Sequence, residues 1–208
     1  MEHIDLTRAV GAVDRSVVPS ERDGAPVRSV VATRTYDADI DDVWDAITTA
    51  ERIGRWLTPV SGDLRLGGRF QLEGNAGGTI TTCEPPATLA VTWELGDKVS
   101  WVEATLSPDA EGGTRLRLTH TVPVDDHWDE YGAGAVGMGW DLSLLGLLNH
   151  LTTGGGPVDA ETWMATPEAI TFMRTSGEAW RAAAVAGGEP PDVAGPASDR
   201  CIAAFTGG

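Results

Sequence analysis

The most constraining feature of this chain is a succession of short segments between residues 60 and 123 in which apolar and polar side chains alternate. Gly, Pro or Asp separates the segments, which read GDLRLGG, RFQLEG, GGTITTCEPP, TLAVTWEL, VSWVEATLS and TRLRLTHTV. Side chains of a strand point to opposite faces in turn, so each segment predicts a strand with one covered and one wet face. Short turns between such strands favour antiparallel pairing. The stretch therefore predicts an antiparallel sheet that needs a second layer.

A helix that can cover this sheet follows it in the sequence. In residues 139–151, GWDLSLLGLLNHL, large apolar side chains recur at intervals of three and four, which predicts one long amphipathic helix. The sequence TTGGGP at 152–157 ends it. A helix is also predicted from Asp39 to about residue 57, with Asp41 and Asp42 in its first turn, where carboxylates favour the helix dipole.

Two extensions flank this α+β core. VRSVVATRTY at 27–36 predicts a strand, and RSVV at 15–18 could pair with it across an Asp-Gly turn signal. Beyond residue 156, TPEAITFMRTSGEAWRAAAVAG predicts a helix, and a last short helical piece is predicted near ASDRCIAAF. Phe172 and Trp180 in this tail need a surface to cover, either on the domain or on a second copy of the chain. We predict an N-terminal extension over 1–26, the main domain over 27–155 and a helical C-terminal extension over 156–208.

Charge and composition narrow the partners. The chain has 31 acidic and 15 basic side chains, a formal net charge of −16, which repels phosphate backbones and anionic lipids. We therefore predict neither a nucleic acid nor a membrane as a partner. The first residues lack a secretory signal pattern and the longest apolar run is too short to span a bilayer, so we expect a cytoplasmic protein. Cys83 and Cys201 fit neither a disulfide framework nor a zinc site, and we expect reduced thiols.

Residues 132–137 spell GxGxxG at the start of a helix, as in a dinucleotide-binding fingerprint. That fingerprint requires a parallel strand directly before it, within a βαβ unit, and the flanking sequence predicts none. Small residues that allow close packing of a loop and a helix are the better explanation.

An acidic cluster precedes this glycine motif and offers metal-ligating side chains, namely Asp125, Asp126, His127, Asp129 and Glu130. Their spacing matches neither an EF-hand loop nor HExxH, so a solvated acidic loop is favoured over a metal site. The chain also lacks a GxSxG elbow. We predict no metal and no cofactor.

His120 interrupts an inward-facing aliphatic row. In RLRLTH at 115–120, Leu116, Leu118 and His120 share one face of the predicted strand. His120 is therefore either a satisfied core residue or a polar group in a cavity, with Thr82 and Tyr131 as further polar candidates. The eight tryptophans, among them Trp56, Trp93 and Trp140 on the facing elements, either fill the core or leave irregular apolar space.

Several motifs in this order resemble one known family. They are DADIDDVWDAITTAERIGRWLTP, GDLRLGGRFQLEG, EPP followed by LAVTWE, GGTRLRLTH, and GW at the start of the long helix. Together, over residues 27–152, they resemble the SRPBCC or START-like superfamily, in particular the branch named after the C-terminal domain of the Aha-type activator of the heat-shock ATPase. The resemblance implies a helix-grip fold, in which a curved antiparallel sheet wraps round a long C-terminal helix with a hydrophobic tunnel between them.

These observations lead to one main expectation, the binding of a small, largely hydrophobic molecule between sheet and helix. The predicted cavity residues are Trp56, Phe70, Leu72, Ile80, Trp93, Leu118, His120, Tyr131, Trp140 and Leu144. One alternative is an enzyme of cyclase or hydrolase type, with His120 as acid or base aided by Tyr131. Another is an interaction module whose tail mediates homodimerisation. An isolated polar residue in an apolar pocket favours binding over turnover.

Overall fold

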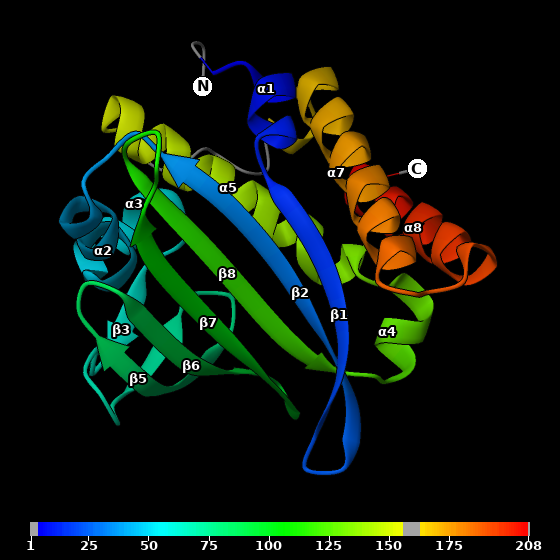
Figure 1. Cartoon of the computed structure of the whole chain (residues 1–208), viewed down its shortest axis with the longest axis horizontal. Coiled ribbons are helices and arrows are strands. Elements are labelled where there is room, and N and C mark those ends of the chain that lie inside the picture. The colour runs from blue at the N-terminus through cyan, green and yellow to red at the C-terminus, as the bar shows by residue number, and fades with distance from the viewer. Residues whose placement is uncertain (1–3, 156–162, 208) are drawn as a thin grey trace. The chain divides into compact units, whose positions relative to one another are not determined.

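The computed structural model describes residues 4–155 and 163–207 (Figure 1). The strands are β1 Asp14–Arg22, β2 Ala25–Tyr36, β3 Val60–Gly62, β4 Arg69–Leu72, β5 Gly77–Glu84, β6 Thr88–Leu95, β7 Lys98–Pro108 and β8 Thr114–Pro123. The described helices are α1 Leu6–Gly11, α2 Ile40–Thr48, α3 Ala50–Trp56, α4 Asp126–Tyr131, α5 Gly134–Thr153, α7 Pro167–Ala186 and α8 Pro191–Thr206. The strands form one antiparallel sheet in the order β1-β2-β8-β7-β6-β5-β4-β3, which confirms the predicted α+β class.

The chain divides into two compact units. The first comprises Met1–Ala32, Thr121–Leu142 and Asp159–Gly208, and the second comprises Thr33–His120 and Ser143–Val158. Strands β2 and β8 and helix α5 each continue from one unit into the other. The predicted boundaries at 26/27 and 155/156 stay predictions.

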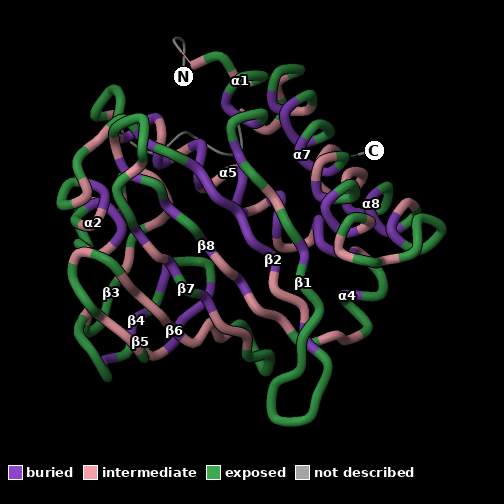
Figure 2. Tube along the Cα trace, viewed as in Figure 1, coloured by how far each residue is buried: buried purple, intermediate pink, exposed green. Residues whose placement is uncertain are grey.

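The second unit contains the meander from β3 to β7, in which each strand pairs with the next. Directly opposite residues on β6 and β7, such as Val91 with Val102, share a face. The predicted alternation holds on β8, where Leu116, Leu118 and His120 are buried. Strands β1 and β2 do not alternate in this way: β1 is mostly exposed, and β2 is mostly buried in its second half (Figure 2).

The first unit buries the C-terminal helices. Helix α7 packs against β1, α1 and α8, and its Phe172 and Trp180 are 3% and 0% exposed. Gly137 on α5 explains part of this packing, because a Cβ there would lie 2.2 Å from Cε2 of Trp180. This contact supports close packing as the role of the GxGxxG glycines.

Four local predictions were wrong. The predicted helix over 39–57 is two helices, because Thr49 has an extended backbone (φ −91°, ψ 126°) between α2 and α3. GDLRLGG is a strand only at its first residue, since the amide of Gly68 donates to the carbonyl of Arg65 in a tight turn. The acidic segment after Asp125 is helix α4 rather than a loop, and α8 begins at Pro191, well before the predicted short helix.

Candidate functional site

His120 lies near the end of β8 beside two residues of the neighbouring hairpin. Its ring centroid is 5.8 Å from that of Trp93 in an edge-on arrangement, and its Nε2 is 2.8 Å from the Ser100 hydroxyl. Trp93 on β6 and Ser100 on β7 are directly opposite partners, so they present their side chains on one face. We call this surface of the second unit, with Phe70 and Leu118, the His120 face.

The tautomer of His120 is linked to the hydrogen bonds of Ser100. The Ser100 hydroxyl has a single proton and two neighbouring acceptor atoms, the carbonyl oxygen of Trp93 at 3.1 Å and Nε2 of His120 at 2.8 Å. If the proton goes to the carbonyl, the hydroxyl oxygen accepts from Nε2–H of His120, and if it goes to His120, Nε2 is the acceptor. Which ring nitrogen carries the proton therefore follows from the direction of the Ser100 hydrogen bond.

Burial keeps this ring neutral. His120 is 6% exposed, and desolvation lowers its pKa from 6.5 to about 4. At neutral pH the site therefore presents an uncharged imidazole, which can both donate and accept a hydrogen bond.

The surroundings of the ring are apolar. Phe70 on β4 extends the aromatic row, with its ring centroid 6.4 Å from that of Trp93. Leu72, Ile80 and Leu118 are buried on the strands of the same unit. Trp93 and Ser100, in contrast, are only half-buried, so the His120 face keeps some access to solvent.

The part of α5 that belongs to the second unit is held at two points. The Tyr36 hydroxyl donates to the carbonyl of Leu144 at 3.2 Å. Gly146 lets the helix approach α3, because a Cβ there would lie 2.5 Å from the carbonyl oxygen of Trp56. The Trp56 indole donates to the carbonyl of Ala46 at 2.9 Å, so its polar edge is used within the helical pair.

The second unit thus contains most of the predicted cavity residues: Trp56, Phe70, Leu72, Ile80, Trp93, Leu118, His120 and Leu144. Tyr131 and Trp140 belong to the first unit. Glu130 raises the pKa of Tyr131 through a hydrogen bond and its charge, and the ring of Tyr131 lies 5.1 Å from that of His127. Thr82 is half-buried on β5, which β6 and β7 separate from β8 in the sheet. That these residues line one cavity stays a prediction.

Sequence reasoning missed Ser100, the hydrogen-bond partner of His120. The alternation of β7 contained the signal, because Ser100 has the same parity as the inward residues Val102, Ala104 and Leu106. It also missed Asp141, a buried carboxylate of the first unit, which the apolar spacing of α5 concealed.

The acidic cluster has a structural role at one position. Asp125 begins α4, and its carboxylate accepts from the backbone amides of His127 and Trp128 at 3.1 and 3.0 Å. Within residues 4–155 and 163–207, no three His, Cys, Asp or Glu side chains are placed to hold a metal ion. Cys83 and Cys201 are free thiols, and burial raises the pKa of Cys201 to about 11.

The antiparallel sheet, the helix pair after β2 and the long α5 define an α+β protein of the helix-grip class. The chain belongs to the family of activator of Hsp90 ATPase homolog 1-like proteins, whose family model matches residues 37–152, more than half of its length. None of its described helices is long and apolar enough to cross a membrane.

Solved structures agree with this assignment. The crystal structure of CalU16 from Micromonospora echinospora is 35% identical, covering 83% of this chain and 98% of that one, with a TM-score of 0.68. Its solution structure is 34% identical over 85% and 97% of the two chains, with a TM-score of 0.72. The Aha1 dimer from Colwellia psychrerythraea, 20% identical over 62% and 98% with a TM-score of 0.51, shares the fold alone. No curated protein matches the chain in sequence.

Proposed function

We propose that the chain binds a small, largely apolar molecule with one uncharged polar group at the His120 face. The observation that carries this proposal is the neutral, buried His120 ring beside the half-buried Trp93 and Ser100. The aromatic rings supply apolar contact area, and the imidazole supplies one orienting hydrogen bond. Membership of the family supports the fold that this proposal requires.

Charge argues for an uncharged polar group. A ring with a pKa of about 4 offers no positive charge to an anionic head group at neutral pH. Desolvating a ligand charge against Phe70 and Trp93 would also cost free energy without a compensating partner. A ligand hydroxyl or carbonyl group needs no positively charged partner and carries no charge to desolvate.

The test compares two probes that differ by one hydroxyl, 2-naphthol and naphthalene, in titrations of tryptophan fluorescence. His120→Leu should weaken 2-naphthol binding by about 1 to 3 kcal/mol, because the hydroxyl loses its buried partner, and should change naphthalene binding little. His127→Leu, which replaces an exposed histidine of the first unit, is the matched control and should change neither. Equal losses for both probes in His120→Leu, or no binding of either probe to the wild type, would contradict the proposal.

An enzyme is the second candidate, because a serine hydroxyl 2.8 Å from a histidine is a nucleophile and base arrangement. Two features count against it. The carbonyl of Trp93, 3.1 Å from the Ser100 hydroxyl, competes with His120 for its single proton, and a ring with a pKa of about 4 is a weak base. Hydrolysis of 4-nitrophenyl acetate that Ser100→Ala and His120→Leu both abolish would favour the enzyme over the binding protein.

Homodimerisation through the tail stays a prediction with less support. Phe172 and Trp180, which motivated it, are buried within the first unit of the chain itself. The mass in solution, measured by light scattering, decides it.

A further inference from the structure

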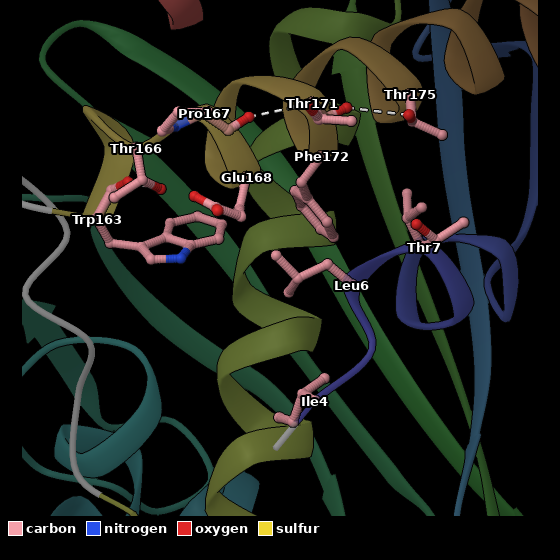
Figure 3. Close-up of a pocket in the computed structure, with 11 residues that line it drawn as sticks. Ile4, Leu6, Thr7, Trp163, Thr166, Pro167, Glu168, Thr171, Phe172 and Thr175 are labelled. Carbon is pink, nitrogen blue, oxygen red and sulfur yellow. Dashed lines mark hydrogen bonds between the residues drawn. The ribbon is translucent and has the colours of Figure 1, made fainter. Parts of the chain in front are cut away.

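The first unit contains a cavity of about 720 Å³ that the proposed function does not use. It lies between the segment from Ile4 to α1 and the start of α7 (Figure 3). Its apolar lining includes Leu6, Trp163 and Phe172, and the rings of Trp163 and Phe172 meet edge-on with centroids 6.0 Å apart. A cavity of this volume suits a small organic molecule.

The polar atoms of the lining are mainly acceptors. Three of its threonine hydroxyls donate their protons to backbone carbonyls: Thr166 to Trp163 at 2.8 Å, Thr171 to Pro167 at 2.8 Å, and Thr175 to Thr171 at 2.9 Å. Figure 3 shows the last two of these bonds along α7. Their oxygens retain lone pairs but no free proton. The carboxylate of Glu168, also in the lining, only accepts when ionised.

Few donors at the same place could hold an anion: the side chains of the lining add only the indole N–H of Trp163 and the hydroxyl of Thr7. Pro167 has no amide proton, and the amides of Ala169 and Ile170 already donate to the side chain and the carbonyl of Thr166 at 3.2 and 3.1 Å. The beginning of α7 therefore offers few of the amide protons that bind anions at other helix ends. A net charge of −16 further disfavours an anionic ligand.

We propose that this cavity binds an organic cation, namely a protonated amine on an aromatic or similarly sized apolar body. The ammonium group donates to Glu168 and to a threonine oxygen close to it. The apolar body packs against Leu6 and Phe172, and the face of Trp163 stabilises the positive charge. Asp5 and Arg8, which flank the lining residues of α1, carry opposite charges and offset one another.

The test uses three probes with one aromatic body, measured by calorimetry on the full chain at low salt: 1-naphthylmethylammonium, 1-naphthylmethanol and 1-naphthoate. The ammonium compound should bind tightest and the carboxylate weakest. Glu168→Gln should weaken ammonium binding by about twofold to fivefold, the range of an exposed ion pair, and leave the alcohol unchanged. Trp163→Ala should weaken both.

Two control variants separate binding in this cavity from binding elsewhere on the chain. Glu178→Gln removes an exposed acid of α7 outside the cavity lining, so it should leave ammonium binding unchanged. His120→Leu should also leave it unchanged, which keeps this proposal distinct from binding at the His120 face. Equal affinity for the three probes, absence of binding, or equal losses in Glu168→Gln and Glu178→Gln would each overturn the proposal.

Discussion

Each unit buries a titratable side chain, Asp141 in the first and His120 in the second, and the two are satisfied in opposite ways. Oδ2 of Asp141 accepts from Nε of Arg15 at 3.0 Å, from the indole of Trp180 at 3.0 Å, and from the hydroxyl of Ser176. A second guanidinium nitrogen of Arg15 lies 2.9 Å from it. Burial raises the pKa of Asp141, and the charge of Arg15 opposes that rise.

His120 is accommodated as a neutral group instead. Desolvation lowers its pKa, and its Nε2 is bonded to a serine hydroxyl rather than to a charged group. The donors to Asp141 come from β1 and α7, so the carboxylate joins three elements of the first unit. The carboxyl group of Asp141 therefore links three elements of the first unit, whereas the His120 ring is buried as a neutral group.

The largest expected effect comes from breaking the cluster in the first unit. Asp141→Leu would leave the guanidinium of Arg15 buried, with its side chain only 7% exposed and its main partner removed. We expect the free energy of unfolding in urea to fall by about 3 to 5 kcal/mol, the cost typical of breaking a buried pair.

Two variants sharpen this comparison. Replacing both charges, as Arg15→Met with Asp141→Leu, should cost less than Asp141→Leu alone, because no unpaired charge remains. His120→Leu should lower the free energy of unfolding by no more than about 1 kcal/mol. It removes the hydrogen-bond partner of the Ser100 hydroxyl, but this hydroxyl is half-buried and can bind water instead. If Asp141→Leu lowered the free energy of unfolding by less than about 1 kcal/mol, Asp141 would contribute no more to stability than His120, which would contradict the comparison.

The next effect is the pH dependence of stability that His120 confers. Its pKa is about 4 in the folded chain and has the ordinary histidine value of 6.5 once the chain unfolds, so the unfolded chain binds more protons between these values. Stability from this residue is therefore present above pH 6.5 and is lost as the pH falls towards 4, by about 3 kcal/mol in total.

The measurement is the difference in unfolding free energy between wild type and His120→Leu from pH 7 to pH 4. Both proteins have the same carboxylates, so subtracting one curve from the other removes the contribution of the carboxylates that titrate near pH 4. His127→Leu, in which His120 is intact, should follow the wild type. Parallel curves for wild type and His120→Leu would show that the ring is not buried in its neutral form.

The sequence was sufficient for features that depend on local periodicity. Alternation placed Leu116, Leu118 and His120 on one buried face, and spacing placed the long helix that became α5. It failed at GDLRLGG, because a leucine alternation next to glycines also occurs in a turn: Leu66 is 62% exposed there. Leu95, the last apolar residue of the alternating segment TLAVTWEL, is 59% exposed at the hairpin end.

Features that depend on distant pairs could not be predicted in this way. Arg15 and Asp141 are 126 residues apart, and no local pattern links a strand at the N-terminus to a residue of α5. The partner of His120 could be predicted in part, because the alternation of β7 alone places Ser100 on its inner face. The strand order that brings β7 next to β8 then completes the pair.

The smallest expected effect tests the hydrogen bond that defines the candidate site. Ser100→Ala removes the hydroxyl that is hydrogen-bonded to Nε2 of His120, so the buried ring must find another partner or change its tautomer. We expect a loss of about 1 kcal/mol in the free energy of unfolding and a change in the ring ¹⁵N chemical shifts, which report the protonated nitrogen. Ser107→Ala, at an exposed position of the same strand, should change neither. If the wild-type spectrum shows the proton on Nδ1, Ser100 is the donor to His120 instead, and the serine then resembles an activated nucleophile rather than part of a binding surface.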